Sequence, residues 1–213
     1  MIVVVIFLYG SEQSRTYDID DCIAFRKTSE VYGGLSNMAP GYKIDIYGIQ
    51  FLTSEALYQA CRFPKHPEIQ QQIIKQHSPM YAKFVSKKYA SLTRKDWERE
   101  RIKIMRWALR VKLVNNWYSF GELLKSTDGK VIVEDSSKDT FWGAKKTENK
   151  FIGVNVLGRL LMQLREQYLK IENQSLITLA PPTIDNFTLM GKQVGIINID
   201  VSKQLYGRNE TLW

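Results

Sequence analysis

The sequence contains few of the residues that carry metal or nucleophile chemistry, with two cysteines and two histidines among 213 residues. Cys22 and Cys61 cannot build a disulfide framework, and they lack the spacing of a zinc site. His66 and His77 belong to no HExxH motif. A zinc hydrolase, a Ser-His-Asp hydrolase and a Cys-His hydrolase are therefore disfavoured, and we expect neither a metal nor a cofactor. This cysteine usage fits the reducing cytoplasm.

The sequence also lacks a segment that reads as a membrane anchor. The apolar run over residues 1–9 is too short to span a bilayer, and no basic residues precede it. We expect a buried strand there, with a cleaved signal peptide as the minor alternative. No repeat and no low-complexity tract is visible. The sequence therefore predicts a cytoplasmic protein without membrane contact.

The charge of the chain is positive and unevenly distributed. The apolar fraction of 44% supports a folded core, and the formal net charge is +8. Residues 81–114 hold eleven Lys or Arg against three acidic residues, a surplus of 11 − 3 = 8. Such a segment favours a polyanionic partner, and the alternative is a solvated helix face.

The pattern of apolar residues predicts an α+β fold that is predominantly helical with a small β-sheet. We expect a polar loop over 11–21 and a strand pair over 43–51 that turns at Tyr47-Gly48. Helices are expected from 54 to before Pro64 and over 67–76, 79–85, 94–117, 120–125 and 156–169, with a strand over 131–134. The division expected is a catalytic domain over 1–179 and a β-rich appendage over 180–213, packed on the same domain.

One helix carries chemically useful groups on a single face. Thr53 and Ser54 can cap it, and Glu55 lies in its first turn. Steps of three and four place Glu55, Tyr58, Gln59 and Arg62 together. This face is either half solvated or lines a polar pocket. The first alternative indicates a structural helix, and the second indicates an enzyme site.

Three other clusters could carry chemistry, and each has a structural alternative. Residues 33–37 (GGLSN) can be a simple turn. Asp96 can serve the start of its own helix, and Trp97 can be a core residue beside the basic ridge, which we define as Arg99, Lys103, Arg106 and Arg110. Residues 139–144 (DTFWGA) can be a loop with a buried Trp142.

Taken in order, these clusters resemble the NADAR (YbiA-like) family. The resemblance rests on six blocks: Gly-x-Leu-Ser-Asn (33–37), Thr-Ser-Glu-x-x-Tyr-Gln-Ala (53–60), Ser-Pro-Met-x-Ala-Lys (78–83), Asp-Trp-x-x-x-Arg-x-x-x-Met (96–105), Val-Glu-x-Ser-x-x-Asp-x-x-Trp-Gly (133–143) and Asn-x-Leu-Gly-x-Leu-Leu-Met-x-Leu-Arg (155–165). It covers roughly residues 25–168.

The resemblance implies cleavage of an N-glycosidic bond at a ribose, in ADP-ribosyl groups or in riboflavin-pathway intermediates. Ala56 stands where many members have His, and residues 144–146 (AKK) replace a glycine-rich run. The chain instead is similar to the branch paired with DarT-type DNA ADP-ribosyltransferase toxins. That branch implies an antitoxin that removes ADP-ribose from guanine in DNA, with single-stranded DNA favoured and ADP-ribose as the product.

The chemistry assigns expected roles to individual residues. A carboxylate beside the anomeric carbon stabilises an oxocarbenium-like transition state or activates water, and the candidates are Glu55 and Asp139. The basic ridge is expected to hold the DNA backbone. The expected ligand-binding residues are Arg26, Lys27, Gly33, Gly34, Asn37, Tyr58, Gln59, Trp97, Trp142, Gly143 and Asn155.

Three functions remain open at this point. The first is a DNA-guanine ADP-ribosyl glycohydrolase, the second a small-molecule N-glycosidase of riboflavin or NAD-type intermediates, and the third a non-catalytic ADP-ribose or nucleic-acid binding module. Strong salt dependence of binding separates DNA from a nucleotide substrate. Loss of turnover on Glu55→Gln separates an enzyme from a binding module.

Overall fold

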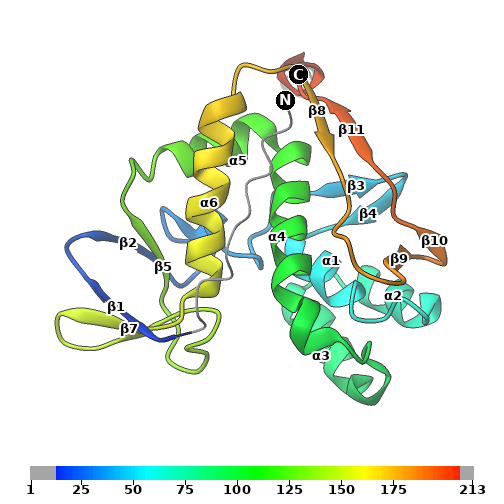
Figure 1. The fold of residues 1–213 in the computed structure, drawn as a ribbon, viewed down its shortest axis with the longest axis horizontal. Helices are drawn as coiled ribbons and strands as arrows, with labels where there is room; N and C mark the ends of the chain where they lie inside the picture. Colours follow the sequence, from blue (N-terminus) through cyan, green and yellow to red (C-terminus); the bar gives the residue numbers. More distant parts are fainter. Residues whose placement is uncertain (1–12, 207–213) are drawn as a thin grey trace.

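The computed structural model describes residues 13–206, and it confirms the α+β fold (Figure 1). The helices are α1 (Ser54–Ala60), α2 (Pro67–Ile74), α3 (Pro79–Lys88), α4 (Trp97–Asn115), α5 (Trp117–Lys125), α6 (Val156–Ile171) and α7 (Lys203–Tyr206), with 3-10 turns at Gly33–Leu35 and Ala90–Leu92. The strands are β1 (Arg15–Asp18), β2 (Cys22–Phe25), β3 (Ile44–Ile46), β4 (Ile49–Phe51), β5 (Val131–Glu134), β6 (Lys145–Lys146), β7 (Lys150–Gly153), β8 (Leu176–Leu179), β9 (Thr188–Leu189), β10 (Lys192–Gln193) and β11 (Ile197–Asp200).

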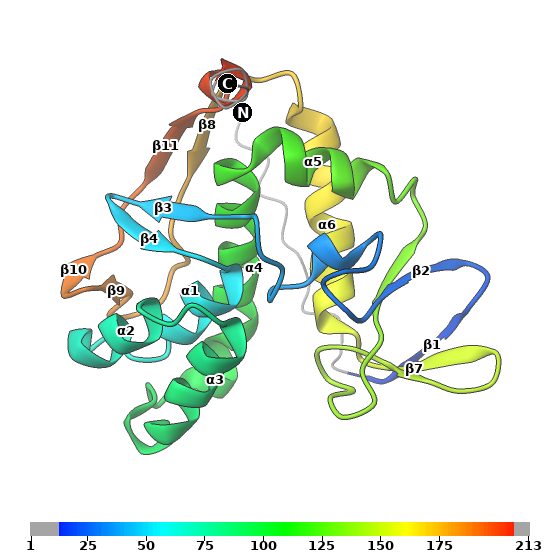
Figure 2. The ribbon, with the colours of Figure 1, turned by 180° about the vertical axis from the view of Figure 1, so that it is seen from behind.

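The long helix α4 forms the centre of the molecule. It contacts α1, α5, α6, β3 and β8. Figures 1 and 2 show α6 beside it, with α1 to α3 and β3–β4 on one side and β1, β2, β5 and β7 on the other. The side of α4 that faces the core carries Ile104, Ala108 and Val111, which are fully buried. Leu161 and Leu164 of α6 belong to the same core.

The strands form several small sheets instead of one. Residues 11–21 were expected to be a loop, and this is wrong for Arg15–Asp18, which forms β1 and pairs antiparallel with β7. The residues of β1 are mostly exposed, so no apolar alternation marks the strand in the sequence. Its backbone hydrogen bonds come from a partner more than 130 residues away, and a local pattern cannot report that pairing.

The strand pairs β3–β4 and β2–β5 differ in type. The β3–β4 hairpin turns at Tyr47-Gly48 as predicted, with positive φ angles of 54° and 82°. Positive φ at both central residues is the backbone of a type I′ turn, which suits the twist of a two-residue hairpin. The pair β2–β5 is parallel, with Phe25 opposite Glu134. This register brings the end of β5 to the functional region.

The residues after 179 pack against the same core as the rest of the chain. β8 pairs antiparallel with β11, so the expected boundary at residue 180 falls between two paired strands. The fully buried Gln70 of α2 donates to the carbonyl oxygens of Ala60 and Thr188 and accepts a hydrogen bond from the Met190 N–H. Phe187 and Val194 complete the contact within the main core.

The strand expected over residues 1–9 lies outside the described residues. Within residues 13–206, no helix combines the length and the apolar character that a bilayer crossing requires.

Candidate functional site

A cleft of about 370 Å³ opens between α1, the N-terminal half of α4 and the segments around residues 37 and 134–142. It brings together seven of the residues expected from the sequence: Asn37, Glu55, Tyr58, Gln59, Trp97, Asp139 and Trp142. The other residues that line it are Ser36, Met38, Arg62, Lys83, Glu98, Arg101, Met105, Glu134, Ser136 and Leu157. Six expected ligand-binding residues are not among those lining the cleft, namely Arg26, Lys27, Gly33, Gly34, Gly143 and Asn155.

The polar face of α1 borders this cleft. Thr53 has an extended backbone and its hydroxyl oxygen accepts a hydrogen bond from the Ala56 N–H at 3.2 Å, which starts the helix where the sequence predicts. All four polar residues of the predicted face line the cleft. Ala60 and Cys61 on the opposite side are buried in the core. Between the two alternatives, the structure therefore supports a polar pocket.

Glu55 is held firmly at the base of the cleft. Its N–H donates to the Asn37 carbonyl oxygen at 3.0 Å, and its Oε1 accepts a hydrogen bond from the Gln59 amide at 2.8 Å. The residue is 6% exposed. Burial raises the pKa of the Glu55 carboxyl group, while Lys83, the Gln59 hydrogen bond and Arg62 act in the opposite direction. These three favourable contacts stabilise the ionised form.

Glu134, which the sequence reasoning did not select, is a second acid in the same cleft. Burial, followed by the negative charges of Asp139 and Glu55, raises its pKa to about 7. A carboxyl group with this pKa can hold or release a proton near neutral pH. Glu134 lies in the Val-Glu-x-Ser block at the end of a predicted strand. That position is the feature of the sequence from which it could have been selected as a candidate.

Asn155 does not line the cleft but holds the backbone of the strand that carries Glu134. Its side chain is fully buried, the Nδ2 amide donates to the Ile132 carbonyl oxygen at 2.8 Å, and Oδ1 accepts a hydrogen bond from the Glu134 N–H at 3.2 Å. Its backbone is left-handed, with φ of 52°. Both ends of the amide are thus used to fix β5, which sets the position of Glu134.

Asp139 lines the cleft but also organises its own loop. Its Oδ1 accepts hydrogen bonds from the N–H groups of Phe141 and Trp142 at 3.1 and 3.0 Å. This is the loop role weighed against a catalytic one in the sequence. The negative charge of Asp139 also affects the cleft, because it helps to raise the pKa of Glu134.

Aromatic rings and guanidinium groups form one wall of the cleft. The Tyr58 ring lies 4.9 Å from that of Trp97 and 5.8 Å from that of Trp142, measured between centroids. The Arg62 guanidinium lies 4.9 Å from the Trp97 ring, and the Arg101 guanidinium 3.9 Å from the Phe141 ring. Trp97 is 8% exposed, so it belongs to the core and to the cleft at once. Such a wall suits a flat base next to an anionic group.

The segment that carries Asn37 is fixed from below by a buried lysine. Lys112 is fully buried, and its Nζ donates to the carbonyl oxygens of Gly34 and Ser36 at 2.6 and 3.0 Å. Burial holds the pKa of the Lys112 ammonium well below its ordinary value. The Asn37 Oδ1 accepts a hydrogen bond from the Ser54 hydroxyl at 3.1 Å. The loop is therefore a rigid edge of the cleft.

The two glycines and the two basic residues expected to bind pyrophosphate are not among the residues that line the cleft. A Cβ atom on Gly33 would overlap the Thr28 carbonyl oxygen, so this glycine permits close backbone packing. The Arg26 side chain is 60% exposed and lies 3.9 Å from the Asp135 carboxylate. The N–H groups of Arg26 and Lys27 donate to the Glu30 carboxylate.

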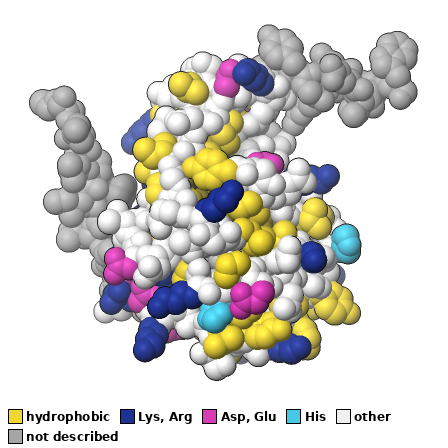
Figure 3. All heavy atoms as spheres, turned by 90° about the vertical axis from the view of Figure 1, so that its right-hand side faces the viewer, with side chains coloured by type: hydrophobic (Ala, Val, Ile, Leu, Met, Phe, Trp, Pro, Cys, Tyr) yellow, Lys and Arg dark blue, Asp and Glu magenta, His cyan; other side chains and the backbone are white. Residues whose placement is uncertain are grey.

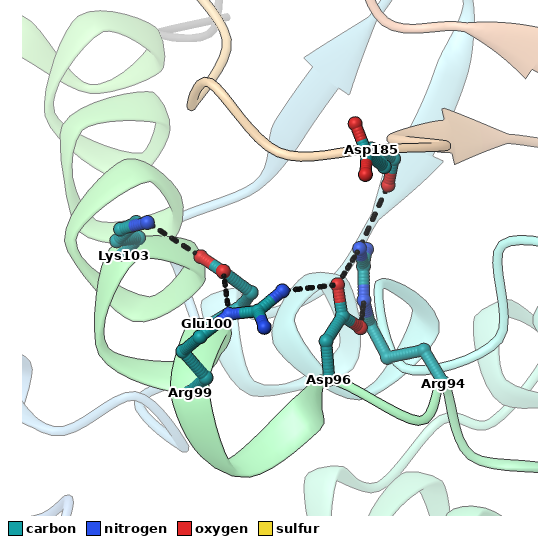
Figure 4. Close-up of polar contacts among 6 residues, drawn as sticks. All are labelled: Arg94, Asp96, Arg99, Glu100, Lys103 and Asp185. Carbon is teal, nitrogen blue, oxygen red and sulfur yellow. Dashed lines mark hydrogen bonds and ion pairs between the residues drawn. The ribbon is translucent and has the colours of Figure 1, made fainter.

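The basic ridge lies on a different face of α4 from the cleft residues Glu98, Arg101 and Met105. Figure 4 shows how its N-terminal part is paired: the Glu100 carboxylate lies 2.7 Å from both the Arg99 and the Lys103 nitrogens. Arg110 is largely buried, which lowers its pKa, and it donates to Gln167 at 3.2 Å. Much of the expected positive surface is thus neutralised or covered.

A second hollow, of about 420 Å³, lies beside Arg94 between residues 64–66 and 185–186. The Arg94 guanidinium is bound to the Asp96 carboxylate at 2.6 and 2.9 Å and to the Asp185 carbonyl oxygen at 2.7 Å (Figure 4). This ion pair lowers the pKa of Asp96. Asp96 of this hollow has a lowered pKa, whereas the cleft contains two acids of raised pKa, so we place the chemistry in the cleft.

The chain matches a family model and several known proteins. The NADAR domain model matches residues 24–169. The N-glycosidase YbiA of Escherichia coli K12 is 35% identical over 148 residues, which cover 70% of this chain and 89% of YbiA. The riboflavin biosynthesis protein PYRR of Zea mays is 37% identical over 161 residues, which cover 69% of this chain, although only 25% of the maize protein is matched.

The fold has a solved counterpart as well. The NMR structure of E. coli YbiA matches with a TM-score of 0.62 and 33% identity, covering 72% of this chain and 88% of that protein. The match to the domain model spans more than half of the chain, and it includes every acid and aromatic residue of the cleft. The chain therefore belongs to the NADAR family.

Proposed function

We propose that this protein is an N-glycosidase that removes ADP-ribose from guanine bases in DNA. The observation that carries the proposal is the pair of acids Glu55 and Glu134 in one cleft, both with raised pKa values. Carboxyl groups that influence one another share protons, so near neutral pH one can be ionised while the other keeps its proton. Hydrolysis of a glycosidic bond needs this division of roles.

The surroundings favour one assignment of the two roles. Lys83, Arg62 and the Gln59 amide stabilise an ionised Glu55, whereas the charges of Asp139 and Glu55 favour a protonated Glu134. In the proposed reaction, the bond between the anomeric carbon and the guanine nitrogen breaks as positive charge develops on the ribose. The Glu55 carboxylate stabilises this charge and orients the attacking water.

Glu134 completes the proton balance of the reaction. It donates its proton to the leaving nitrogen, and the water oxygen bonds to the anomeric carbon. The proton lost by the water passes to a carboxylate of the pair. The products are ADP-ribose and the restored guanine base.

The walls of the cleft support a substrate with a base and a pyrophosphate. Tyr58, Trp97 and Trp142 offer flat surfaces for stacking. Arg62, Arg101 and Lys83 supply the positive charge that a pyrophosphate requires. The net charge of +8 supports a nucleic-acid substrate.

A small-molecule substrate is the second candidate. It is favoured by the names of the relatives, an N-glycosidase and riboflavin biosynthesis proteins. The same two acids would act on a riboflavin-pathway or NAD-derived intermediate. The absence of His at Ala56, noted in the sequence, argues for the DNA substrate.

The resemblance to the DarT-paired branch supports a role as the antitoxin of a DNA ADP-ribosyltransferase toxin in the cytoplasm. The test is incubation with guanine-ADP-ribosylated single-stranded DNA and, in parallel, with riboflavin-pathway intermediates, with mass spectrometry of the products. Free ADP-ribose from the DNA supports the proposal, and turnover of only the small molecules supports the second candidate. Binding of ADP-ribose without any turnover would identify a binding module and overturn both.

A further inference from the structure

Helix α3 exposes large apolar side chains that the fold does not use. Met80, Tyr81 and Phe84 are 71%, 64% and 65% exposed. The opposite side of the helix is buried, since Ala82 and Ser86 are covered and α3 contacts α1 and α2. A contiguous patch of exposed apolar side chains marks an interaction surface, whereas a single exposed apolar residue is ordinary.

The same surface of α3 is positively charged. Lys83, Lys87 and Lys88 are exposed, and the helix contains no acidic residue. Steps of three and four place Tyr81, Phe84 and Lys88 on one side of the helix. Figure 3 shows hydrophobic side chains gathered at the lower end of one face of the molecule, with Lys or Arg, Asp or Glu and His side chains close to them.

The α3 surface is continuous with the cleft through Lys83. This residue lines the cleft, and its charge acts on both Glu55 and Glu134. A chain that leaves the cleft along α3 therefore meets further lysines and two exposed rings. The basic ridge of α4 does not offer this path, because it lies on another face of α4 and two of its members, Arg99 and Lys103, pair with the Glu100 carboxylate.

We infer that α3 binds the single-stranded DNA that flanks the modified base, with Tyr81 and Phe84 stacking on neighbouring bases and Lys87 and Lys88 contacting phosphates. Aromatic rings beside cations are the usual surface for single strands, because every base has a face that can stack. The inference rests on the proposed DNA substrate and assigns the surface that holds it.

The test measures binding separately from chemistry. The affinity for an unmodified single-stranded oligonucleotide is measured by fluorescence anisotropy at several salt concentrations. The variants are Tyr81→Ala/Phe84→Ala and Lys87→Glu/Lys88→Glu. The matched control is Lys146→Glu/Lys150→Glu, which reverses two exposed charges at the end of the molecule away from α3 (Figures 1 and 2).

We expect the Tyr81→Ala/Phe84→Ala variant to bind DNA about tenfold more weakly or worse, from the typical contribution of one stacked base. The lysine variant should also flatten the plot of log affinity against log salt by about 0.7 for each phosphate that it no longer neutralises. The control should retain most of the affinity. Equal affinity of the Tyr81→Ala/Phe84→Ala variant and the parent protein would overturn the inference.

A second measurement separates this inference from the proposed function. Turnover of an ADP-ribosylated guanine nucleoside should be unchanged in both α3 variants, because Tyr81, Phe84, Lys87 and Lys88 are not among the residues that line the cleft. Unchanged turnover also shows that the variants fold. If the parent protein binds DNA through α3 but releases no ADP-ribose, the proposed function fails alone. If it releases ADP-ribose from DNA while the α3 variants keep the parent KM, the α3 inference fails alone.

Discussion

Glu134→Gln should stabilise the protein at alkaline pH and damage its activity at the same time. Burial and two neighbouring negative charges move the pKa of Glu134 from 4.5 to about 7 in the folded state. At about 1.36 kcal/mol for each pKa unit, the ionised side chain costs the folded state about 3 kcal/mol. Glutamine has nearly the same shape and no charge, so it avoids this cost.

The sign follows from which state holds the proton. Below about pH 4.5 both the folded and the unfolded chain have Glu134 protonated, and the substitution gains nothing. As pH rises, the unfolded chain releases the proton first, so the parent loses stability through the window between 4.5 and about 7. Above that window the advantage of the variant reaches its full value, up to about 3 kcal/mol.

The activity should change in the opposite direction. A general acid contributes about 10²- to 10⁴-fold to the rate, so Glu134→Gln should lower kcat by at least about a hundredfold. In the parent, kcat should fall as pH rises through the pKa of Glu134, because the acid then lacks its proton.

Urea unfolding at about pH 4 and about pH 8 measures the stability, and ADP-ribose release measures the rate. Glu148→Gln is the matched control, because Glu148 is exposed in the turn between β6 and β7. The reasoning is refuted if the variant and the parent differ by the same free energy at both pH values. A kcat that stays level from acidic to alkaline pH would refute the role as acid.

Three further predictions concern other parts of the site. Glu55→Gln should reduce ADP-ribose release by about a hundredfold or more while calorimetry still detects ADP-ribose binding, and parent-level turnover would contradict the assignment. Asn155→Ala leaves the Glu134 N–H and the Ile132 carbonyl without their side-chain partner. Urea unfolding should therefore show a free energy of unfolding lower by about 1–3 kcal/mol for each group. Asn149→Ala is the control and should change it little, because Asn149 is exposed. Trp142→Ala removes one face of the aromatic wall and should weaken ADP-ribose binding by about 1–3 kcal/mol, with Trp142→Phe retaining most of it.

The sequence predicted the local features of the site well. The face formed by Glu55, Tyr58, Gln59 and Arg62 follows from helix periodicity, and the structure shows that the face borders the cleft. The hairpin at Tyr47-Gly48 follows from its turn residues. Strand β5 has the bounds predicted from the sequence, 131–134.

The features that escaped prediction depend on contacts between distant segments. Strand β1 is exposed and gains its hydrogen bonds from β7. The importance of Glu134 arises only when β5 brings it near Glu55 and Asp139. The basic ridge has the three- and four-residue spacing of one helix face, but spacing cannot show that Glu100 pairs with two of its members, Arg99 and Lys103. The structural role of Asn155 could not be predicted, because its hydrogen-bond partners are backbone groups of Ile132 and Glu134, which are distant in the sequence.

The contacts that Gln70 makes with the C-terminal residues determine where a shortened form of this protein can end. The family match ends at residue 169, yet the Gln70 amide joins the last residue of α1 to Thr188 and Met190. A fragment trimmed to the matched range would expose the apolar surface under Phe187 and Val194. The Gln70 amide would keep its hydrogen bond to Ala60 and lose those to Thr188 and Met190. The helix that presents Glu55 would then lose its support from behind. The smallest unit that keeps the cleft intact therefore extends past the family match and includes β8 to β11.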